Sequence, residues 1–129
     1  MEFSLTPGKT ALAEMLVGQS DTASSYGSGL IDVFATPAMI TFMEKTAMLS
    51  IQSELPAGYI TLGTEICVTH VKATAMGKRV TCETELIEIN GKKLLFKVRA
   101  FDEAGLIGEG THRRYIVNAE EFVNRLSQA

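Results

Sequence analysis

The chain has 129 residues, of which 46% are hydrophobic and 21% charged, and its formal net charge at pH 7 is −3. This length and composition exclude an intrinsically disordered protein and predict a single globular domain over residues 1–129. A nucleic-acid partner is not expected, because basic residues cluster only in dipeptides such as Lys92–Lys93 and Arg113–Arg114.

The first ten residues, MEFSLTPGKT, lack the basic start and apolar core of a secretory signal. No apolar run reaches the roughly 18 residues that a membrane span requires. The only two cysteines, Cys67 and Cys82, lie in apolar, strand-like runs and are interpreted as buried thiols rather than as a disulfide framework. We therefore expect a cytoplasmic protein that has no membrane partner and binds no metal.

The predicted elements begin with a strand over residues 10–17 and a Ser- and Gly-rich loop over residues 20–29, which is either a plain surface connection or a lid. A long helix is predicted over residues 37–54, with Thr36 as its N-cap and Pro37 at its first position. Apolar residues occur around most of the circumference of this helix, which is typical of a buried helix rather than of one on the surface.

Four consecutive strands are predicted after the helix, over residues 59–71, 80–89, 93–101 and 106–117. Asn90–Gly91 predicts a type I′ hairpin between the second and third of them. A short amphipathic helix is expected over residues 119–126. A long helix wrapped by an antiparallel meander sheet of about five strands is an α+β arrangement, and it has the outline of the hot-dog fold. Since such a sheet covers one side of the helix, we expect a second protomer to cover the rest.

Glu44 is the exceptional residue of the predicted helix, because it lies on a largely apolar stripe. A carboxylate that loses its hydration there costs several kcal/mol unless it is paired or its pKa is raised. Glu44 therefore either pairs with a cation such as Lys45 at the helix surface or serves as a general base near neutral pH.

His70 lies on the same face of its predicted strand as Ile66 and Val68. A single histidine in a strand is often structural, but any imidazole chemistry in this chain requires either His70 or His112, the only two histidines.

Thr36 is explained as a helix cap, but a hydroxyl at the positive end of a helix dipole also suits a thioester carbonyl whose oxygen becomes negative during attack. Thr36 and Glu44 are about 12 Å apart along the helix axis, so His70 or the substrate would have to bridge the gap between them. Gly63, inside a predicted strand, indicates either a bulge, a close backbone approach or a packing accommodation.

Three segments, VFATPAMITFMEKTA (33–47), LGTEICVTHVKAT (62–74) and IGEGTHRRYIV (107–117), resemble the signature segments of the fluoroacetyl-CoA thioesterase group of hot-dog proteins, in the same order and spacing. The resemblance extends from about residue 31 to residue 122. It implies that the chain cleaves an acyl-CoA into free acid and CoA, that it works as a homodimer, and that its site lies near the subunit interface.

The resemblance also implies the roles of particular residues. The catalytic threonine, glutamate and histidine of the family fall on Thr36, Glu44 and His70, and the family's site glycine and arginine fall on Gly63 and Arg114. No cofactor is implied, because coenzyme A enters as part of the substrate. Pairing of dimers into tetramers is left open.

The segment YGSGLID (26–32) departs from the fluoroacetyl-specific pattern. Leu30 and Gly27 stand where the specialist carries bulky aromatic residues near the substrate pocket, so Leu30 is assigned to substrate binding and a generic short-chain acyl-CoA is expected. Glu44 would attack the thioester or activate a water, His70 would manage protons, and Thr36 would be its hydroxyl partner. The alternatives are a hot-dog hydratase or dehydratase and a non-catalytic acyl-CoA-binding module.

Overall fold

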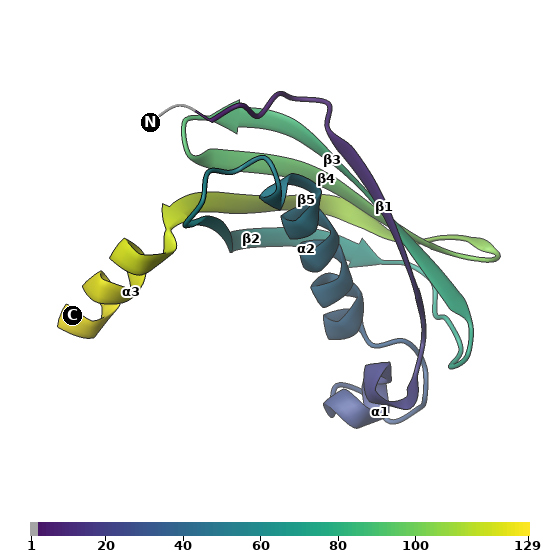
Figure 1. Ribbon diagram of the computed structural model, residues 1–129. Coiled ribbons are helices and arrows are strands. Elements are labelled where there is room, and N and C mark those ends of the chain that lie inside the picture. Colours follow the sequence, from purple (N-terminus) through teal and green to yellow (C-terminus); the bar gives the residue numbers. More distant parts are fainter. Residues whose placement is uncertain (1–2) are drawn as a thin grey trace.

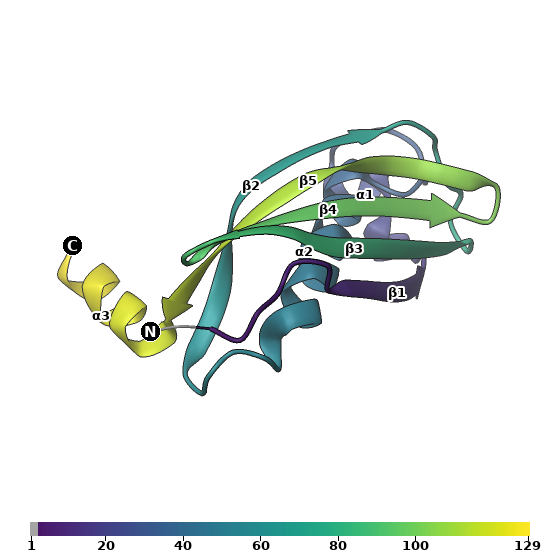
Figure 2. The ribbon, with the colours of Figure 1, turned by 90° about the horizontal axis from the view of Figure 1, so that it is seen from above.

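A curved antiparallel sheet of five strands wraps one long helix, α2 (Thr36–Gln52), as Figures 1 and 2 show. The structure is a computed structural model and describes residues 3–129. The strands are β1 (Thr10–Leu16), β2 (Tyr59–His70), β3 (Arg79–Asn90), β4 (Lys93–Asp102) and β5 (Gly105–Asn118). The short elements are the 3-10 helix η1 (Gln19–Asp21), α1 (Ala23–Tyr26) and the C-terminal helix α3 (Ala119–Gln128), which extends away from the sheet (Figure 1).

The strands lie in the order β1-β3-β4-β5-β2, which corrects the expected meander of four consecutive strands. β3, β4 and β5 do form a meander, because two-residue turns join them. The connection between β2 and β3, residues 71–78, is longer, and β2 pairs with β5 instead. β2 is therefore an edge strand, and within residues 3–129 its other edge has no partner strand.

The hairpin between β3 and β4 forms where the sequence predicts it, but its turn differs from the expected type I′ geometry. Asn90 pairs with Lys93, so Gly91 and Lys92 are the two turn residues. Gly91 has φ +62°, and no residue other than glycine has positive φ among the described residues. A positive φ at the first turn position alone is the pattern of a type II′ turn.

The core lies between α2 and the concave face of the sheet. One face of the helix is buried against strand side chains that alternate inward; the helix contributes Ala38, Met39, Met43, Ala47 and Ile51, and the strands contribute residues such as Leu86, Phe96, Val98 and Ile107. Each large apolar side chain buried in this way stabilises the fold by about 1.5–3 kcal/mol. Gly108 allows the Met39 side chain of α2 to pack closely against β5, since a Cβ at Gly108 would lie 2.6 Å from the Met39 sulfur.

The opposite face of α2 remains exposed in the single chain, so the helix is not buried on all sides. Leu49 is 57% exposed, and Thr41 and Lys45 are exposed beside it. No helix within residues 3–129 is long and apolar enough to cross a lipid bilayer.

Two local expectations also change. Residues 20–29 are not a plain loop, because the fully buried Thr22 donates a hydrogen bond from its hydroxyl to Gln19 O (2.8 Å) and accepts one from Ser25 N (3.3 Å), which organises η1 and α1. Cys67 is exposed rather than buried, because it alternates to the outer face of β2. Cys82 is buried as expected, and this burial raises the pKa of its thiol to about 11.

Candidate active site

Thr36 and His70 meet where α2 begins and β2 ends. The Thr36 Oγ1 and His70 Nδ1 atoms are 2.8 Å apart, within hydrogen-bond distance. Thr36 is not the N-cap of the helix, as the sequence suggested; Ala35 takes that position with extended backbone geometry, and Thr36 is the first helical residue. The Thr36 hydroxyl is therefore not used as a cap and reaches the imidazole instead.

Backbone hydrogen bonds hold the segments before Thr36 and after His70 side by side. Phe34 N donates to Thr74 O (2.8 Å), and Val33 forms an isolated antiparallel bridge with Ala75. Val71 N donates to Ile107 O (2.7 Å), which fixes the segment after His70 to β5. The Phe34 ring also packs edge-on against the His70 imidazole, with ring centroids 6.3 Å apart. These contacts fix the relative position of two residues that are 34 apart in the sequence.

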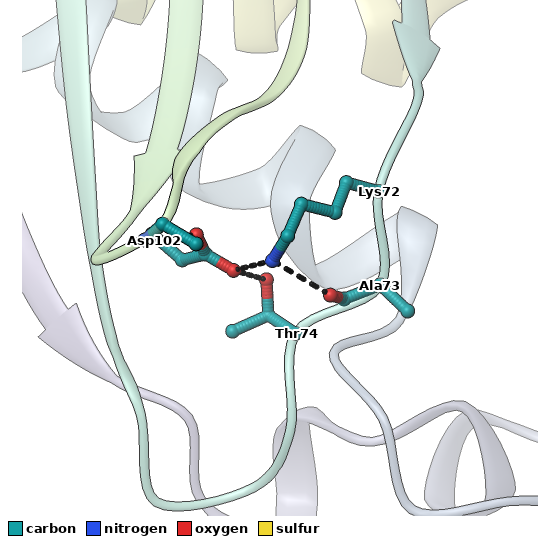
Figure 3. A network of polar contacts seen from close by, with 5 residues as sticks. Lys72, Ala73, Thr74 and Asp102 are labelled. Atoms are coloured by element: carbon teal, nitrogen blue, oxygen red, sulfur yellow. Dashed lines mark hydrogen bonds and ion pairs between the residues drawn. The ribbon is translucent and has the colours of Figure 1, made fainter.

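A polar network anchors the segment that follows His70 to the turn between β4 and β5 (Figure 3). The Asp102 carboxylate accepts hydrogen bonds from Lys72 Nζ (2.5 Å), Thr74 Oγ1 (2.9 Å) and Ala104 N (2.8 Å). Burial alone would raise the pKa of Asp102, but the three hydrogen bonds and the Lys72 charge outweigh burial and hold that pKa below its usual value.

We expect Asp102→Asn to destabilise the fold by about 2 kcal/mol, because it removes the charged acceptor of a side chain that is only 6% exposed. The contribution of the ionised carboxylate is complete above the unfolded-state pKa of about 4 and is lost as the pH falls through the lowered folded-state value. Denaturant unfolding at pH 7 measures the effect, with Glu103→Gln in the same turn as control. Equal stability of the two variants would show that the network does not anchor this segment.

An open cavity of about 290 Å³ lies beside the Thr36–His70 pair. Residues 33–36 and 70–73 line it together with Ala23 and Ser28. Burial lowers the pKa of His70, against the opposing effect of a hydrogen bond with the backbone of Lys72, so the imidazole is neutral at pH 7. His70 Nε2 is buried and has no hydrogen-bond partner among the described residues. A buried polar atom without a partner is uncommon, which marks this nitrogen as a candidate for pairing with a bound molecule or a second chain.

Glu44 lies in a second group of side chains, above Gly63 on β2. A Cβ built on Gly63 would lie 2.8 Å from Glu44 Oε2, 3.2 Å from His112 Cε1 and 3.4 Å from Arg114 Nη1. Only glycine leaves room for the carboxylate, the imidazole and the guanidinium together. The register between β2 and β5 shifts between Gly63 and Glu65, so the bulge that the sequence allowed at Gly63 is present.

Arg114 is buried, with 6% of its surface exposed. Its Nε donates to Thr61 Oγ1 (2.7 Å), its Nη2 donates to Thr61 O (2.9 Å), and its Nη1 lies 3.1 Å from His112 Nε2. Burial lowers the pKa of Arg114, while the nearby charge of Glu44 opposes this effect. The second group thus combines the Glu44 carboxylate with the buried Arg114 cation. Gly63 leaves the space between β2 and α2 that the two side chains occupy.

Acid is expected to destabilise the protein through both histidines. Burial lowers the pKa values of His70 and His112 in the folded state, so the unfolded chain binds more protons below pH 6.5. Stability is therefore complete above about pH 6.5 and falls as the pH drops below it, by up to about 1.4 kcal/mol per pH unit for each histidine. Unfolding curves between pH 5 and pH 8 measure this slope, which His112→Gln should reduce. A flat profile would contradict the lowered pKa values of both imidazoles.

The predicted site residues thus fall into two groups within one chain. Thr36 and His70 form one group, and Glu44, Gly63 and Arg114 form the other. The expectation that Glu44 and His70 share one pocket is not met in the single chain, because Glu44 does not line the cavity beside His70. Glu44 is about 12 Å along the helix from Thr36, as its position in the sequence requires.

Leu30 is 98% exposed and does not line the cavity beside His70 in the single chain. Sequence reasoning gave no role to Thr61 and left His112 as an alternative to His70. A signal for His112 was present, because His112 and Arg114 are two residues apart in a strand and therefore share one face.

Comparisons with known proteins agree with this architecture. Residues 17–120 match the family described as fluoroacetyl-CoA-specific thioesterase. The chain is 39% identical over 97 residues to the fluoroacetyl-CoA thioesterase of Streptantibioticus cattleyicolor, covering 75% of this chain and 70% of that protein.

Solved structures give the same result. A structure of a fluoroacetyl-CoA thioesterase superposes with a TM-score of 0.91 at 32% identity, covering 97% of both chains. A thioesterase superfamily member from Thermus thermophilus matches with a TM-score of 0.85 at 25% identity, covering 95% of this chain and 93% of that one. A hot-dog-like protein from Thermanaerovibrio acidaminovorans shares the fold, with a TM-score of 0.89 at 21% identity over 96% of this chain and 92% of its own. The hot-dog fold expected from the sequence is confirmed, and the chain belongs to the fluoroacetyl-CoA-specific thioesterase family.

Proposed function

We propose that this protein hydrolyses short-chain acyl-CoA thioesters to the free acid and CoA, with Thr36, Glu44 and His70 as catalytic residues. The observation that carries the proposal is the Thr36–His70 pair beside an open cavity, with one imidazole nitrogen left without a partner. Family membership adds the reaction class. Solved structures of the fluoroacetyl-CoA thioesterase include one variant in complex with acetyl-CoA and another in complex with fluoroacetate and CoA.

The proposed enzyme is a homodimer in which each site combines the two groups from different chains. The unpaired edge of β2 is a template for a second strand, and antiparallel pairing of two β2 strands produces a twofold axis. An axis between Ile66 and Cys67 places His70 of one chain opposite Gly63 of the other. Since Glu44 lies directly above Gly63, the carboxylate of one chain then faces the imidazole of its partner. The partner would also cover the exposed face of α2.

In the mechanism that we propose, Glu44 either attacks the thioester carbonyl or activates a water that does so. The C–S bond of the thioester breaks and CoA leaves through its sulfur. The neutral His70 accepts at Nε2 the proton that the water loses, directly or from Glu44, and passes it to the CoA sulfur, while Thr36 holds Nδ1. Free N–H groups at the start of α2 lie beside Thr36 and would stabilise the oxyanion. Label found in the Glu44 carboxylate after single-turnover hydrolysis in ¹⁸O-labelled water would demonstrate attack by Glu44, because direct attack by water puts the label only in the product acid. Trapping of the acyl-enzyme with hydroxylamine detects the same covalent path when water attacks the substrate-derived carbonyl instead.

We propose a generic short-chain acyl group rather than fluoroacetyl alone, because Gly27 and Leu30 provide no aromatic ring near the cavity and Leu30 is directed to solvent. The free cysteines Cys67 and Cys82 fit a reducing compartment, and we place the enzyme in the cytoplasm as part of the same proposal.

A hydrolysis panel of acetyl-, fluoroacetyl-, propionyl-, butyryl- and phenylacetyl-CoA tests the function, with released CoA detected by a thiol reagent. We expect turnover of the short aliphatic esters, including acetyl-CoA. Tight binding of CoA esters without thiol release would instead identify a binding module. Water addition to an enoyl-CoA without thiol release would identify a hydratase.

A further inference from the structure

His112 is buried in β5, with 1% of its surface exposed, and both of its ring nitrogens have partners. Nδ1 lies 2.8 Å from Glu65 O, and Nε2 lies 3.1 Å from Arg114 Nη1. A carbonyl oxygen only accepts hydrogen bonds and a guanidinium only donates them. His112 must therefore be neutral, with its proton on Nδ1 and a lone pair on Nε2.

The burial of His112 agrees with this assignment. Burial lowers the pKa of the imidazole, and the neighbouring Arg114 charge lowers it further, against the opposing effects of the hydrogen bond to Glu65 and of the Glu44 charge. The neutral form is thus the one that the surroundings favour at pH 7.

The hydrogen bond from His112 completes the set of acceptors that fixes the Arg114 guanidinium. The other two acceptors are Thr61 Oγ1 and Thr61 O. All three acceptors are uncharged, so none of them neutralises the cation, whose nearest carboxylate in this group is that of Glu44 above Gly63. Removing the His112 acceptor would free Nη1, the guanidinium nitrogen that lies nearest the Gly63 position. Arg114 and Glu44 form no ion pair among the described residues, so Arg114 acts on the carboxylate through its charge across the space above Gly63.

His112 also stabilises the strand on which the carboxylate rests. Its other partner, Glu65 O, lies directly after the register shift between Gly63 and Glu65. One imidazole thus joins the β2 bulge beneath Glu44 to the cation beside it.

We propose that His112 is a positioning residue of the thioesterase: it holds Arg114, and through Arg114 it orients the Glu44 carboxylate toward the reacting thioester. This inference rests on the proposed function. The hydrogen-bond partners of His112 are Glu65 O and Arg114 rather than Thr36, Glu44 or His70. Its removal is therefore expected to lower kcat and to leave KM within about threefold, because misplacing a reacting group by about 1 Å costs up to about 100-fold in rate.

Two substitutions separate this role from simple packing. His112→Asn places an amide nitrogen where Nδ1 lies and retains the donor to Glu65 O, but it removes the acceptor for Arg114. His112→Gln places an amide oxygen where Nε2 lies and retains that acceptor, but it gives up the donor to Glu65 O, so each variant keeps one of the two contacts. We expect kcat to fall at least about tenfold in His112→Asn and to stay within about threefold of wild type in His112→Gln. An equal loss in both variants, or a larger loss in His112→Gln, would overturn the proposal.

An experiment independent of turnover distinguishes failure of this inference from failure of the proposed function. Nitrogen-15 NMR of the wild-type protein should show His112 neutral, with its proton on Nδ1, at pH 7. Rotation of the Arg114 guanidinium should be slow in wild type and His112→Gln, and fast in His112→Asn. A protonated Nε2, or equal rotation rates in all three proteins, would refute the role of His112 even if the enzyme is active. If the hydrolysis panel shows no activity, these spectra still decide whether His112 holds Arg114.

Discussion

Glu44→Gln is expected to reduce kcat by about 1,000-fold and to change KM little, because the amide can neither attack a carbonyl nor accept a proton from water. The substitution keeps the size of the side chain, so the packing above Gly63 and beside Arg114 is preserved. Steady-state kinetics on acetyl-CoA and propionyl-CoA measure the loss.

Glu88→Gln is the matched control for that experiment. It makes the same chemical change at an exposed position of β3, away from both groups of site residues, and should keep kcat within about twofold. If Glu44→Gln retained a kcat within tenfold of the control, Glu44 would not be the nucleophile or the general base.

Gly63→Ala is expected to lower kcat by about 100-fold with little loss of stability. The new Cβ would lie 2.8 Å from Glu44 Oε2, so the carboxylate must move by a few tenths of an ångström or more from its position. Small displacements of a reacting group have effects of this size on rate. The closest atom is the end of a flexible side chain, and the His112 ring, 3.2 Å from the new Cβ, needs to give by only a few tenths of an ångström. The backbone can therefore remain in place, and the melting temperature should fall only slightly.

Thr64→Ala, at the exposed position next to Gly63, is the control and should keep most of the activity. Gly110 illustrates the opposite case, since a Cβ there would lie 2.0 Å from the backbone oxygen of Cys67 and would disrupt the pairing of β2 with β5. A Gly63→Ala protein with wild-type kcat would show that the Glu44 position is not critical for the reaction.

The sequence predicted the elements of the fold well, because their signals are local. The helix after Thr36, the hairpin at Gly91 and the alternation of the strands each depend on residues within a few positions of one another. The sheet order was predicted incorrectly, because β2 pairs with β5, a strand some 45 residues later in the chain. A pairing over that distance has no local signal in the sequence. Hydrophobic alternation indicates which face of a strand is buried but not which strand lies beside it.

The sequence identified the individual residues of the candidate site, but it did not predict which of them lie next to one another. A carboxylate on an apolar stripe made Glu44 a candidate, and the scarcity of histidines left His70 and His112 as candidates. The resemblance to the thioesterase family assigned the roles to Glu44 and His70. Their separation within the chain follows from α2, which carries Thr36 and Glu44 about two turns apart, so only one of them can reach the end of β2. Periodicity could not reveal the pairing of Thr36 with His70, because a threonine before a proline also fits a helix cap.

The central claim is that Glu44 from one chain and His70 from another complete a single site. Co-expression of Glu44→Gln and His70→Ala chains with different affinity tags allows the heterodimer to be purified. It contains one site with both natural groups and one site that lacks both. We predict that the heterodimer recovers about half of the wild-type kcat per dimer, while each variant homodimer stays at least about 100-fold below wild type. A heterodimer as inactive as the two homodimers would contradict the shared site.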